Sequence, residues 1–173
     1  MAITHKWEAY LDAARRKIQI ASYHAHVLEE QLAQNDFPLD GRPPISVQAS
    51  FEGVVFAVIA AIDQVAQAVN SALKLGLSSG ELFEGVTKEI EVRVPEFRSW
   101  RNDPMGLDLR RLRTRMAHYS YQKRSAKLIW EVESANEAFV GSRELASYAK
   151  AAVAYAHTLE SFLDSLTRGL SSR

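Results

Sequence analysis

The chain has 173 residues, of which 47% are apolar and 24% charged, the length and balance of one ordinary globular domain. It contains no cysteine, which excludes disulfide scaffolds, cysteine-ligated zinc, iron–sulfur clusters and thiol chemistry. The 21 basic and 21 acidic residues cancel, which excludes a polycation. The longest apolar run, Val54 to Ile62, is about half a membrane span, and the N-terminus lacks the apolar core of an export signal. We therefore expect a cytoplasmic single domain over residues 1–173, with no membrane partner.

The first predicted helix runs from about Thr4 to Gln34. Thr4 can cap its first turn, since a threonine hydroxyl accepts a hydrogen bond from a free amide there. Polar residues cover most of the helix, so we expect it on the outside of a bundle. Its apolar residues alternate between spacings of four and three, which predicts one narrow packing stripe: Trp7, Leu11, Ala14, Ile18, Ala21, Ala25, Leu28 and Leu32.

The second predicted helix is apolar most of the way round, which is typical of a central helix. Three prolines and a glycine within 35–46 predict a surface connection that precedes it. We expect the helix from about Val47 to Leu75. Ser46 would cap its start and Gly76 would end it.

Two polar residues interrupt this apolar helix on one face, because Asp63 and Asn70 are seven positions apart. Buried polar groups need hydrogen-bonding partners. One interpretation is that Asp63 and Asn70 bond to each other in the core. The other is that Asp63 or Glu52 supports a functional arginine from across the bundle.

The middle of the chain predicts shorter elements. Ser78 and Glu81 form a capping-box pattern that begins a short helix through about Val86. Residues 89–94 alternate between polar and apolar and stay undecided between helix and strand. The turn at 102–104 begins a helix that continues to about Tyr119, and 127–140 could form a small β-hairpin.

The last predicted helix runs from Ser142 to about Leu170. Its stripe repeats the spacing of the first helix and is widened by Tyr148, Tyr155 and Phe162. Together these elements predict an all-α fold, an antiparallel up-and-down helix bundle of four to five helices. The wide stripe of the last helix and the narrow stripe of the first together leave more apolar surface than the bundle core would bury, so we expect a homodimer. The stripe comprises Leu145, Ala149, Ala152, Ala156, Leu159, Leu163, Leu166 and Leu170.

Positive charge is concentrated between residues 98 and 127. This segment has nine basic and two acidic residues, a net charge of +7, so the remaining chain carries −7. Its centre is the run 110–115, Arg-Arg-Leu-Arg-Thr-Arg, followed by His118, Tyr119 and Tyr121. Arginines beside aromatic rings suit a phosphate backbone with bases that stack. The plainer interpretation is a solvated helix face whose charge is balanced elsewhere in the bundle.

The segment 112–118, Leu-Arg-Thr-Arg-Met-Ala-His, resembles the motif of the HEPN superfamily (higher eukaryotes and prokaryotes nucleotide-binding). That motif is an arginine, a polar residue that is most often asparagine, three further residues and a histidine, late in a small all-α bundle. Arg113 and His118 match it, and Thr114 stands in the place of the asparagine. Some toxin members carry a tyrosine two positions after the histidine, where this chain has Ser120.

The resemblance implies a metal-independent endoribonuclease, often a toxin or defence effector with an antitoxin partner, that works as a dimer without a cofactor. His118 and Arg113 would be catalytic: His118 moves the proton of a ribose 2′-hydroxyl or of the leaving oxygen, and Arg113 holds the phosphate. Thr114 and Asp63 would support them. We expect further contacts to RNA from Arg110, Arg111, Arg115, Tyr119, Tyr121 and Lys123.

The geometry of a regular helix limits how Arg113 and His118 can act together. Positions five apart on a regular helix differ by about 140°, so Arg113 and His118 can share one phosphate only if the helix begins or bends between them, or if a second protomer completes the pair. Positions 111, 115 and 118 lie on one face.

The other histidines are interpreted as surface or structural residues: His5, His24, His26 and His157. A catalytically idle bundle that binds RNA, a nucleotide or a protein partner is the alternative function, and a purely structural bundle is the third.

Overall fold

The computed structural model describes residues 6–34, 44–78, 82–93, 95, 98, 102–119 and 142–171. Within these ranges every regular element is a helix, so the predicted all-α bundle is confirmed. The expected hairpin near 127–140 lies outside the described residues, as do Thr4 and Glu81. The five helices are α1 (Lys6–Gln34), α2 (Ile45–Leu73), α3 (Leu82–Arg93), α5 (Pro104–Tyr119) and α7 (Ser142–Ser171).

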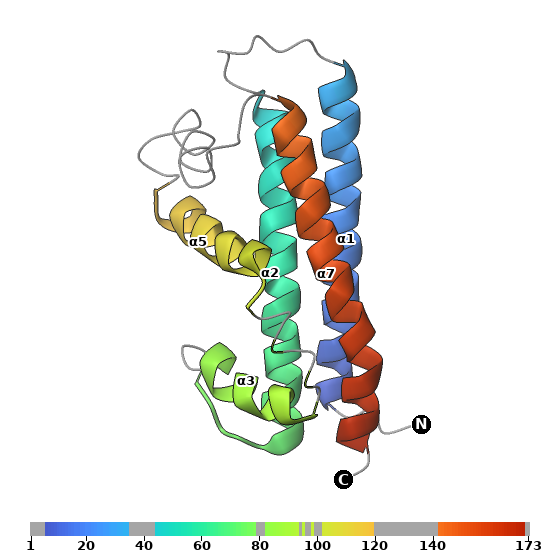
Figure 1. Cartoon of the computed structure of the whole chain (residues 1–173), viewed down its shortest axis with the longest axis vertical. Coiled ribbons are helices and arrows are strands. Elements are labelled where there is room, and N and C mark those ends of the chain that lie inside the picture. Colours follow the sequence, from blue (N-terminus) through green and yellow to red (C-terminus); the bar gives the residue numbers. More distant parts are fainter. Residues whose placement is uncertain are drawn as a thin grey trace.

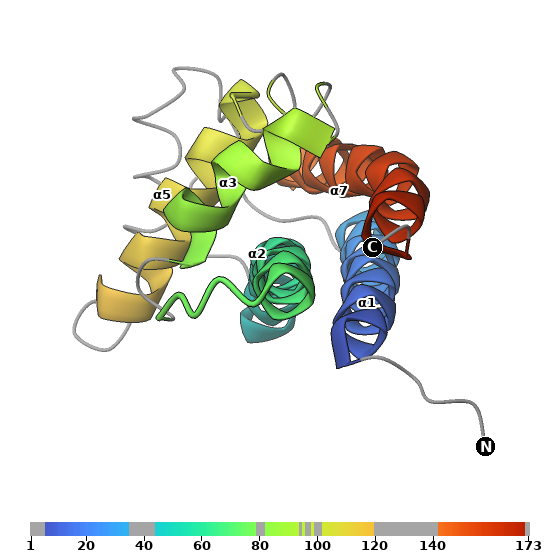
Figure 2. The same cartoon turned by 90° about the horizontal axis from the view of Figure 1, so that it is seen from below.

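The three long helices α1, α2 and α7 lie side by side and form the body of the bundle (Figure 1). Helix α1 runs antiparallel to the other two, whereas α2 and α7 run in the same direction. The short helices α3 and α5 cross the long ones and cover the side of α2 and α7 that faces away from α1 (Figure 2). Helix α1 contacts neither α3 nor α5.

The two predicted packing stripes form the core. In α1, every stripe residue from Trp7 to Leu28 is buried, and Leu32 packs against the core at its edge. In α7, the stripe from Leu145 to Leu166 is buried as well, and the ring of Tyr148 packs against that of Phe51 in α2 with centroids 5.7 Å apart. The narrow stripe of α1 fits its place on the outside, because two helices contact it rather than four.

Helix α2 is the central helix: α2 and α7 each contact all four other helices, and α2 has more buried residues than α7 among the described side chains. Its 14 buried residues lie on several sides of it, which explains its apolar composition. By length and composition alone it could also cross a membrane, although more than half of its most apolar part is buried inside the bundle. Gly53 brings α1 close, because a Cβ atom there would lie 2.6 Å from the ring of His24.

Both ends of α2 differ from the prediction. The helix begins at Ile45 after Pro44, whose carbonyl accepts a hydrogen bond from the Gln48 amide (3.1 Å), and no side chain caps it, so Ser46 is not the cap. It ends at Leu73, because Lys74 adopts a left-handed conformation (φ 52°) ahead of Gly76. Gly76 is left-handed as well (φ 70°), and the side chain of Asn70 bonds the backbone of Leu77, which follows it.

Helix α3 extends further than predicted. It is described from Leu82 onwards, and residues 79–81, which include Glu81 of the predicted capping box, lie outside the described residues. It continues to Arg93 and includes the alternating residues 89–93 that the sequence left undecided. The alternation does not reflect a sheet with one buried face, because Ile90 is buried whereas Val92 is 80% exposed.

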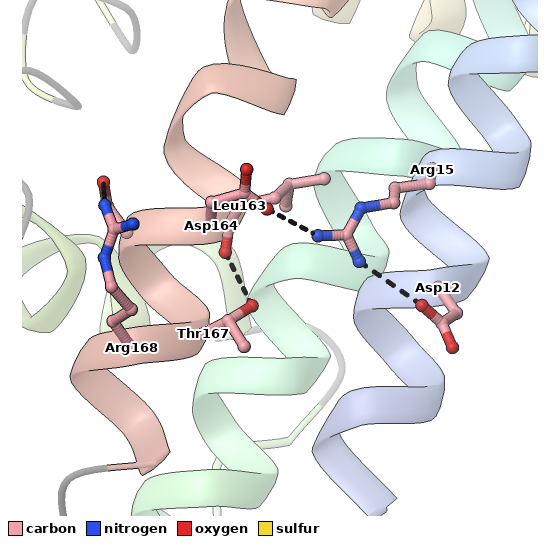
Figure 3. A network of polar contacts seen from close by, with 7 residues as sticks. Asp12, Arg15, Leu163, Asp164, Thr167 and Arg168 are labelled. Atoms are coloured by element: carbon pink, nitrogen blue, oxygen red, sulfur yellow. Dashed lines mark hydrogen bonds and ion pairs between the residues drawn. The ribbon is translucent and has the colours of Figure 1, made fainter.

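Three polar pairs join α1 to α7 along the outside of the bundle, and we call them the polar ladder. Arg15 donates to Asp164 (3.0 Å), Ser22 contacts His157 (3.2 Å), and Lys150 donates to Glu29 (3.2 Å). The partners advance by seven residues on each helix, in opposite directions. Figure 3 shows the first pair, in which Arg15 lies between Asp164 of α7 and Asp12 of its own helix.

Candidate nucleic-acid interface

The motif lies on α5, and the start of this helix follows from its sequence. Asp103 accepts a hydrogen bond at Oδ1 from the backbone amide of Met105 (2.8 Å), as an N-cap residue does. Pro104 occupies the first helical position, where no amide hydrogen is needed. Leu109 and Leu112 are buried and fix the face that α5 turns towards α2 and α7. The predicted turn and helix are therefore confirmed.

Helix α5 carries both motif positions without a break between them. It begins nine residues before Arg113 and ends one residue after His118. The two positions therefore lie about 140° apart around the helix axis. Within one chain, α5 does not bring position 113 and position 118 to the same face.

Another arginine does share a face with position 118. Arg111 lies seven residues earlier, about 20° away around the axis, and its side chain is exposed. Leu107, on the same face, is 42% exposed, so this side of α5 is turned to solvent. Position 115 lies about 60° from position 118. The solvent-facing side of α5 thus combines Arg111 with the helix positions of Arg115 and His118.

Arg113 lies towards the edge that meets α2. Its side chain is exposed, and its positive charge acts on the carboxyl group of Asp63. Asp63 is half-buried in the contact between α2 and α5. Burial raises the pKa of Asp63 above its ordinary value of 3.8, and the charge of Arg113 opposes part of that rise. Arg113 thus acts on Asp63 through its charge, although the two residues are fifty positions apart in the sequence.

Asn70, the predicted partner of Asp63, and Glu52, the alternative support for the motif arginine, make other contacts. The amide of Asn70 donates to the carbonyl of Leu77 (3.2 Å) and accepts from its N–H (3.1 Å). The predicted Asp63–Asn70 pair is thus replaced by a pair between Asn70 and the backbone of Leu77. Glu52 accepts a hydrogen bond from Gln48 on its own helix (3.0 Å). Asp63 is therefore the carboxylate of α2 that interacts with the motif arginine.

Arg110 has a different environment from Arg111 and Arg113. It is half-buried, and its charge acts on the hydroxyl of Tyr155 in α7. Burial raises the pKa of Tyr155, the charge of Arg110 lowers it, and Asp103 raises it further. Because Arg110 lies in the contact between α5 and α7, it is less available to a phosphate than the two exposed arginines.

Some of the remaining predicted site residues lie within the described part of the chain and some do not. Thr114, Arg115, His118 and Tyr119 are helical positions near the end of α5, and Tyr121 and Lys123 lie outside the described residues. Within the described ranges, no cluster of three or more histidines, aspartates and glutamates could hold a metal ion. His157, predicted as an isolated structural residue, contacts Ser22 across α1 and α7, which the sequence did not predict. Residues 22 and 157 each follow directly after a residue of a packing stripe, and this placement could have predicted the contact.

Comparisons with protein-family models, with curated proteins and with solved structures found no match to this chain. The arguments for its function are therefore the motif, the charge of α5 and the surroundings of Arg113.

Proposed function

We propose that this chain is a metal-independent endoribonuclease of the HEPN type that acts in the cytoplasm as a toxin or defence effector. The observation that carries the proposal is that the motif arginine, Arg113, is exposed on α5 and can meet a phosphate, while its charge also acts on Asp63. The exposed Arg111 on the same helix adds a second phosphate-binding cation. RNA is the substrate, and a second copy of the chain is the partner.

The chemistry follows from these groups. His118 takes the proton from a ribose 2′-hydroxyl, whose oxygen then attacks the neighbouring phosphorus. The bond from phosphorus to the 5′-oxygen breaks, and that oxygen receives a proton as it leaves. An arginine guanidinium offsets the charge that develops on the phosphoryl oxygens. The products are a 2′,3′-cyclic phosphate and a 5′-hydroxyl end, and no metal ion takes part.

Two arrangements of the arginines are consistent with this chemistry. In one, His118 acts with Arg111, which shares its face of α5 in the same chain. In the other, His118 acts with Arg113 of the partner subunit, so that a homodimer is required. The first arrangement leaves Arg113 to position α5 against α2, and the second makes it a phosphate ligand.

A cleavage assay tests the function itself. Labelled single-stranded RNA is incubated in EDTA with the purified chain and with the variants His118→Ala, Arg111→Ala and Arg113→Ala. We expect cyclic phosphate ends with the unmodified chain and a loss of at least about 100-fold with His118→Ala. Arg16→Ala is the matched control, since Arg16 is an exposed arginine on α1, which does not contact α5. Unchanged cleavage by His118→Ala would refute the assigned role of His118.

Mixing two inactive variants distinguishes the arrangements. If the partner subunit completes the pair, His118→Ala and Arg113→Ala chains mixed together restore some activity, because one composite site in the mixed dimer keeps both groups. If the pair lies within one chain, Arg111→Ala is the more damaging arginine variant, and mixing it with His118→Ala restores nothing.

The second candidate function is a catalytically idle bundle that binds RNA, a nucleotide or a protein such as an antitoxin. Thr114 in the place of asparagine and Ser120 in the place of tyrosine favour it, since both depart from the motif of active members. In that case Arg111→Ala and Arg113→Ala weaken RNA binding while His118→Ala binds as the unmodified chain does. No cleavage by any variant, with salt-dependent binding, would support this function instead.

A further inference from the structure

Ile20 of α1 and Phe56 of α2 are exposed on the side of the bundle that faces away from α7. Their exposed fractions are 41% and 39%. Ile20 lies about 160° round α1 from Ser22, which contacts α7. Phe56 lies about 140° round α2 from Phe51, whose ring also meets α7. Among the described helices, none covers this side of α1 and α2 (Figure 2). We call this surface, centred on Ile20 and Phe56, the α1–α2 face.

The packing at Gly53 shows that Ile20 and Phe56 lie at the same height along the two helices. A Cβ atom on Gly53 would lie 2.6 Å from the ring of His24, so positions 24 and 53 meet across the helix pair. Because α1 and α2 are antiparallel, position 20, one turn before His24, lies level with positions 56 and 57, one turn after Gly53. Ile20 and Phe56 therefore form one hydrophobic patch, and such patches mark interaction surfaces.

The two helices of this face carry opposite charges. Helix α2 has two charged residues, Glu52 and Asp63, and both are acidic. On α1, the residues one turn before Ile20, at positions 16 and 17, are basic. A partner that fits this face must present cations to α2 and carboxylates to α1, beside a hydrophobic centre. A second copy of the same face meets both conditions when its two helices are exchanged.

We propose that the α1–α2 face binds the same face of a second copy, so that the chain forms a two-fold symmetric dimer. An axis parallel to the helices and midway between α1 and α2 lays α1 of one copy on α2 of the other and keeps every residue at its own height. Ile20 then packs against Phe56 of the partner subunit, and this contact occurs twice. The basic residues at 16 and 17 lie level with positions 60 and 61. Along the helices they are thus within about 5 Å of Asp63 of the partner subunit.

Charge and area both favour this arrangement. An axis across the helices instead lays like helix on like helix, and it gathers Glu52 and Asp63 of both copies at one contact, where carboxylates repel. The two helices have 29 residues each, so they are about 43 Å long, and the pair is about 20 Å wide. The face therefore offers about 800 Å², which is the area each partner contributes to a standard interface.

This dimer keeps the two motif helices apart. Helix α5 contacts α2 but not α1, so it lies beyond α2 at one edge of the face. The exchange of α1 and α2 between the copies places the two α5 helices at opposite edges. The dimer therefore favours the arrangement in which Arg111 and His118 act within one chain. It goes beyond the proposed ribonuclease function, because it forms whether or not RNA is cleaved.

Charged substitutions at the hydrophobic centre test the dimer. The unmodified chain, Ile20→Glu and Phe56→Lys are compared by sedimentation velocity over a concentration series in the micromolar range. Both side chains are exposed, so each variant should fold, which circular dichroism checks. Because the contact occurs twice, each substitution should weaken dimerisation by at least about 30-fold. Val92→Glu is the matched control, since Val92 is 80% exposed on α3, and it should dimerise as the unmodified chain does.

A mixture of the Ile20→Glu and Phe56→Lys chains tests the contact between copies directly. In a dimer of one chain of each kind, the introduced carboxylate meets the introduced ammonium at one contact, and the other contact is the original one. The mixture should therefore dimerise at concentrations at which each variant alone is monomeric.

Three results would overturn the proposal: an unmodified chain that is monomeric throughout the series, variants that dimerise as the unmodified chain does, or a mixture that associates no more tightly than its components. No RNA is present in these samples, so their outcome is separate from that of the cleavage assay.

Discussion

The positive charge of Arg113 on α5 lowers the pKa of the Asp63 carboxyl group on α2, against the larger rise that burial causes. Asp63 lies half-buried in the most apolar helix of the chain, where a charge loses part of its hydration. The positive charge of Arg113 compensates only part of this loss, since burial remains the larger influence on the pKa of Asp63. The ionised carboxylate of Asp63 therefore lowers the stability of the folded chain at neutral pH.

Replacing Asp63 by asparagine should stabilise the fold at neutral pH. Because the pKa of Asp63 is raised in the folded chain, the folded state binds its proton more tightly than the unfolded state does. The stability linked to this group is therefore present below the ordinary value of 3.8 and is lost as pH rises through the raised value. We expect Asp63→Asn to raise Tm by about 2 °C at neutral pH in thermal unfolding.

The same measurement at acidic pH is the control for this prediction. Below the ordinary pKa of an aspartate the carboxyl group is neutral in both states, so the difference between Asp63→Asn and the unmodified chain should shrink. A Tm that falls at neutral pH would mean that the attraction of Arg113 outweighs burial. If Asp63 positions Arg113, the more stable variant should also cleave or bind RNA less well.

The three arginines of the run 110–113 should differ in how they affect RNA binding. In a His118→Ala background, which leaves the RNA intact, Arg111→Ala and Arg113→Ala should each remove about one phosphate contact. The slope of log affinity against log salt should then become less steep by about 0.7 for each. Arg110→Ala should change this slope little and lower Tm instead, because Arg110 lies in the contact between α5 and α7. Fluorescence anisotropy over a salt series measures the slopes, and equal changes for all three would contradict the assignment.

Removal of the cap of α5 should weaken the motif helix. Asp103→Ala loses the hydrogen bond to the amide of Met105, which costs about 1 kcal/mol at a typical N-cap and about 2 to 4 °C in Tm. Asp103→Asn keeps a side-chain oxygen at the same place and should retain most of the stability. Hydrogen exchange in the first turn of α5 should accelerate with alanine and change little with asparagine. Equal effects of the two substitutions would exclude the cap as the cause.

Gly106 should tolerate no larger side chain while Tyr155 is present. A Cβ atom at position 106 would clash with the hydroxyl of Tyr155, so Gly106→Ala should cost about 1 to 3 kcal/mol. Tyr155→Phe removes the clashing oxygen and should restore part of the lost Tm in the double variant. Gly169→Ala is the control, since nothing lies within 4 Å of the added atom, and it should be neutral or stabilising. No rescue by Tyr155→Phe would contradict the contact.

The long helices could be predicted from the sequence because their pattern is set by packing. Burial selects apolar residues at alternate spacings of four and three, and the described stripe residues of α1 and α7 are buried, except Leu32, which is partly buried at the end of α1. Helix ends follow weaker forces, so they were predicted less well. Ser46 has a good capping side chain, yet α2 begins one residue earlier, at Ile45.

The surroundings of the motif could not be predicted from spacing alone. The link between Asp63 and Arg113 depends on how α5 lies across α2, which the tertiary fold determines. From the sequence, Asp63 and Asn70 lie on the same face of one helix, and nothing there distinguishes their partners. Asn70 bonds Leu77 because the chain beyond Gly76 turns back towards it, which only the structure shows. The face shared by positions 111 and 118 could be predicted, because helical rotation depends only on numbering.

The shared direction of α2 and α7 has a consequence for the order in which the chain folds. A chain that leaves the end of α2 must travel back along roughly 43 Å of helix before α7 can begin, and α3 and α5 lie on this return path. The α1–α2 hairpin depends on contacts close in sequence and can form first, whereas α7 closes loops of more than a hundred residues against α1. Substitutions between α1 and α2 should therefore slow folding, and substitutions on α7 should mainly speed unfolding. Helix α5 packs against both α2 and α7, so its contact with α7 should form in this last stage.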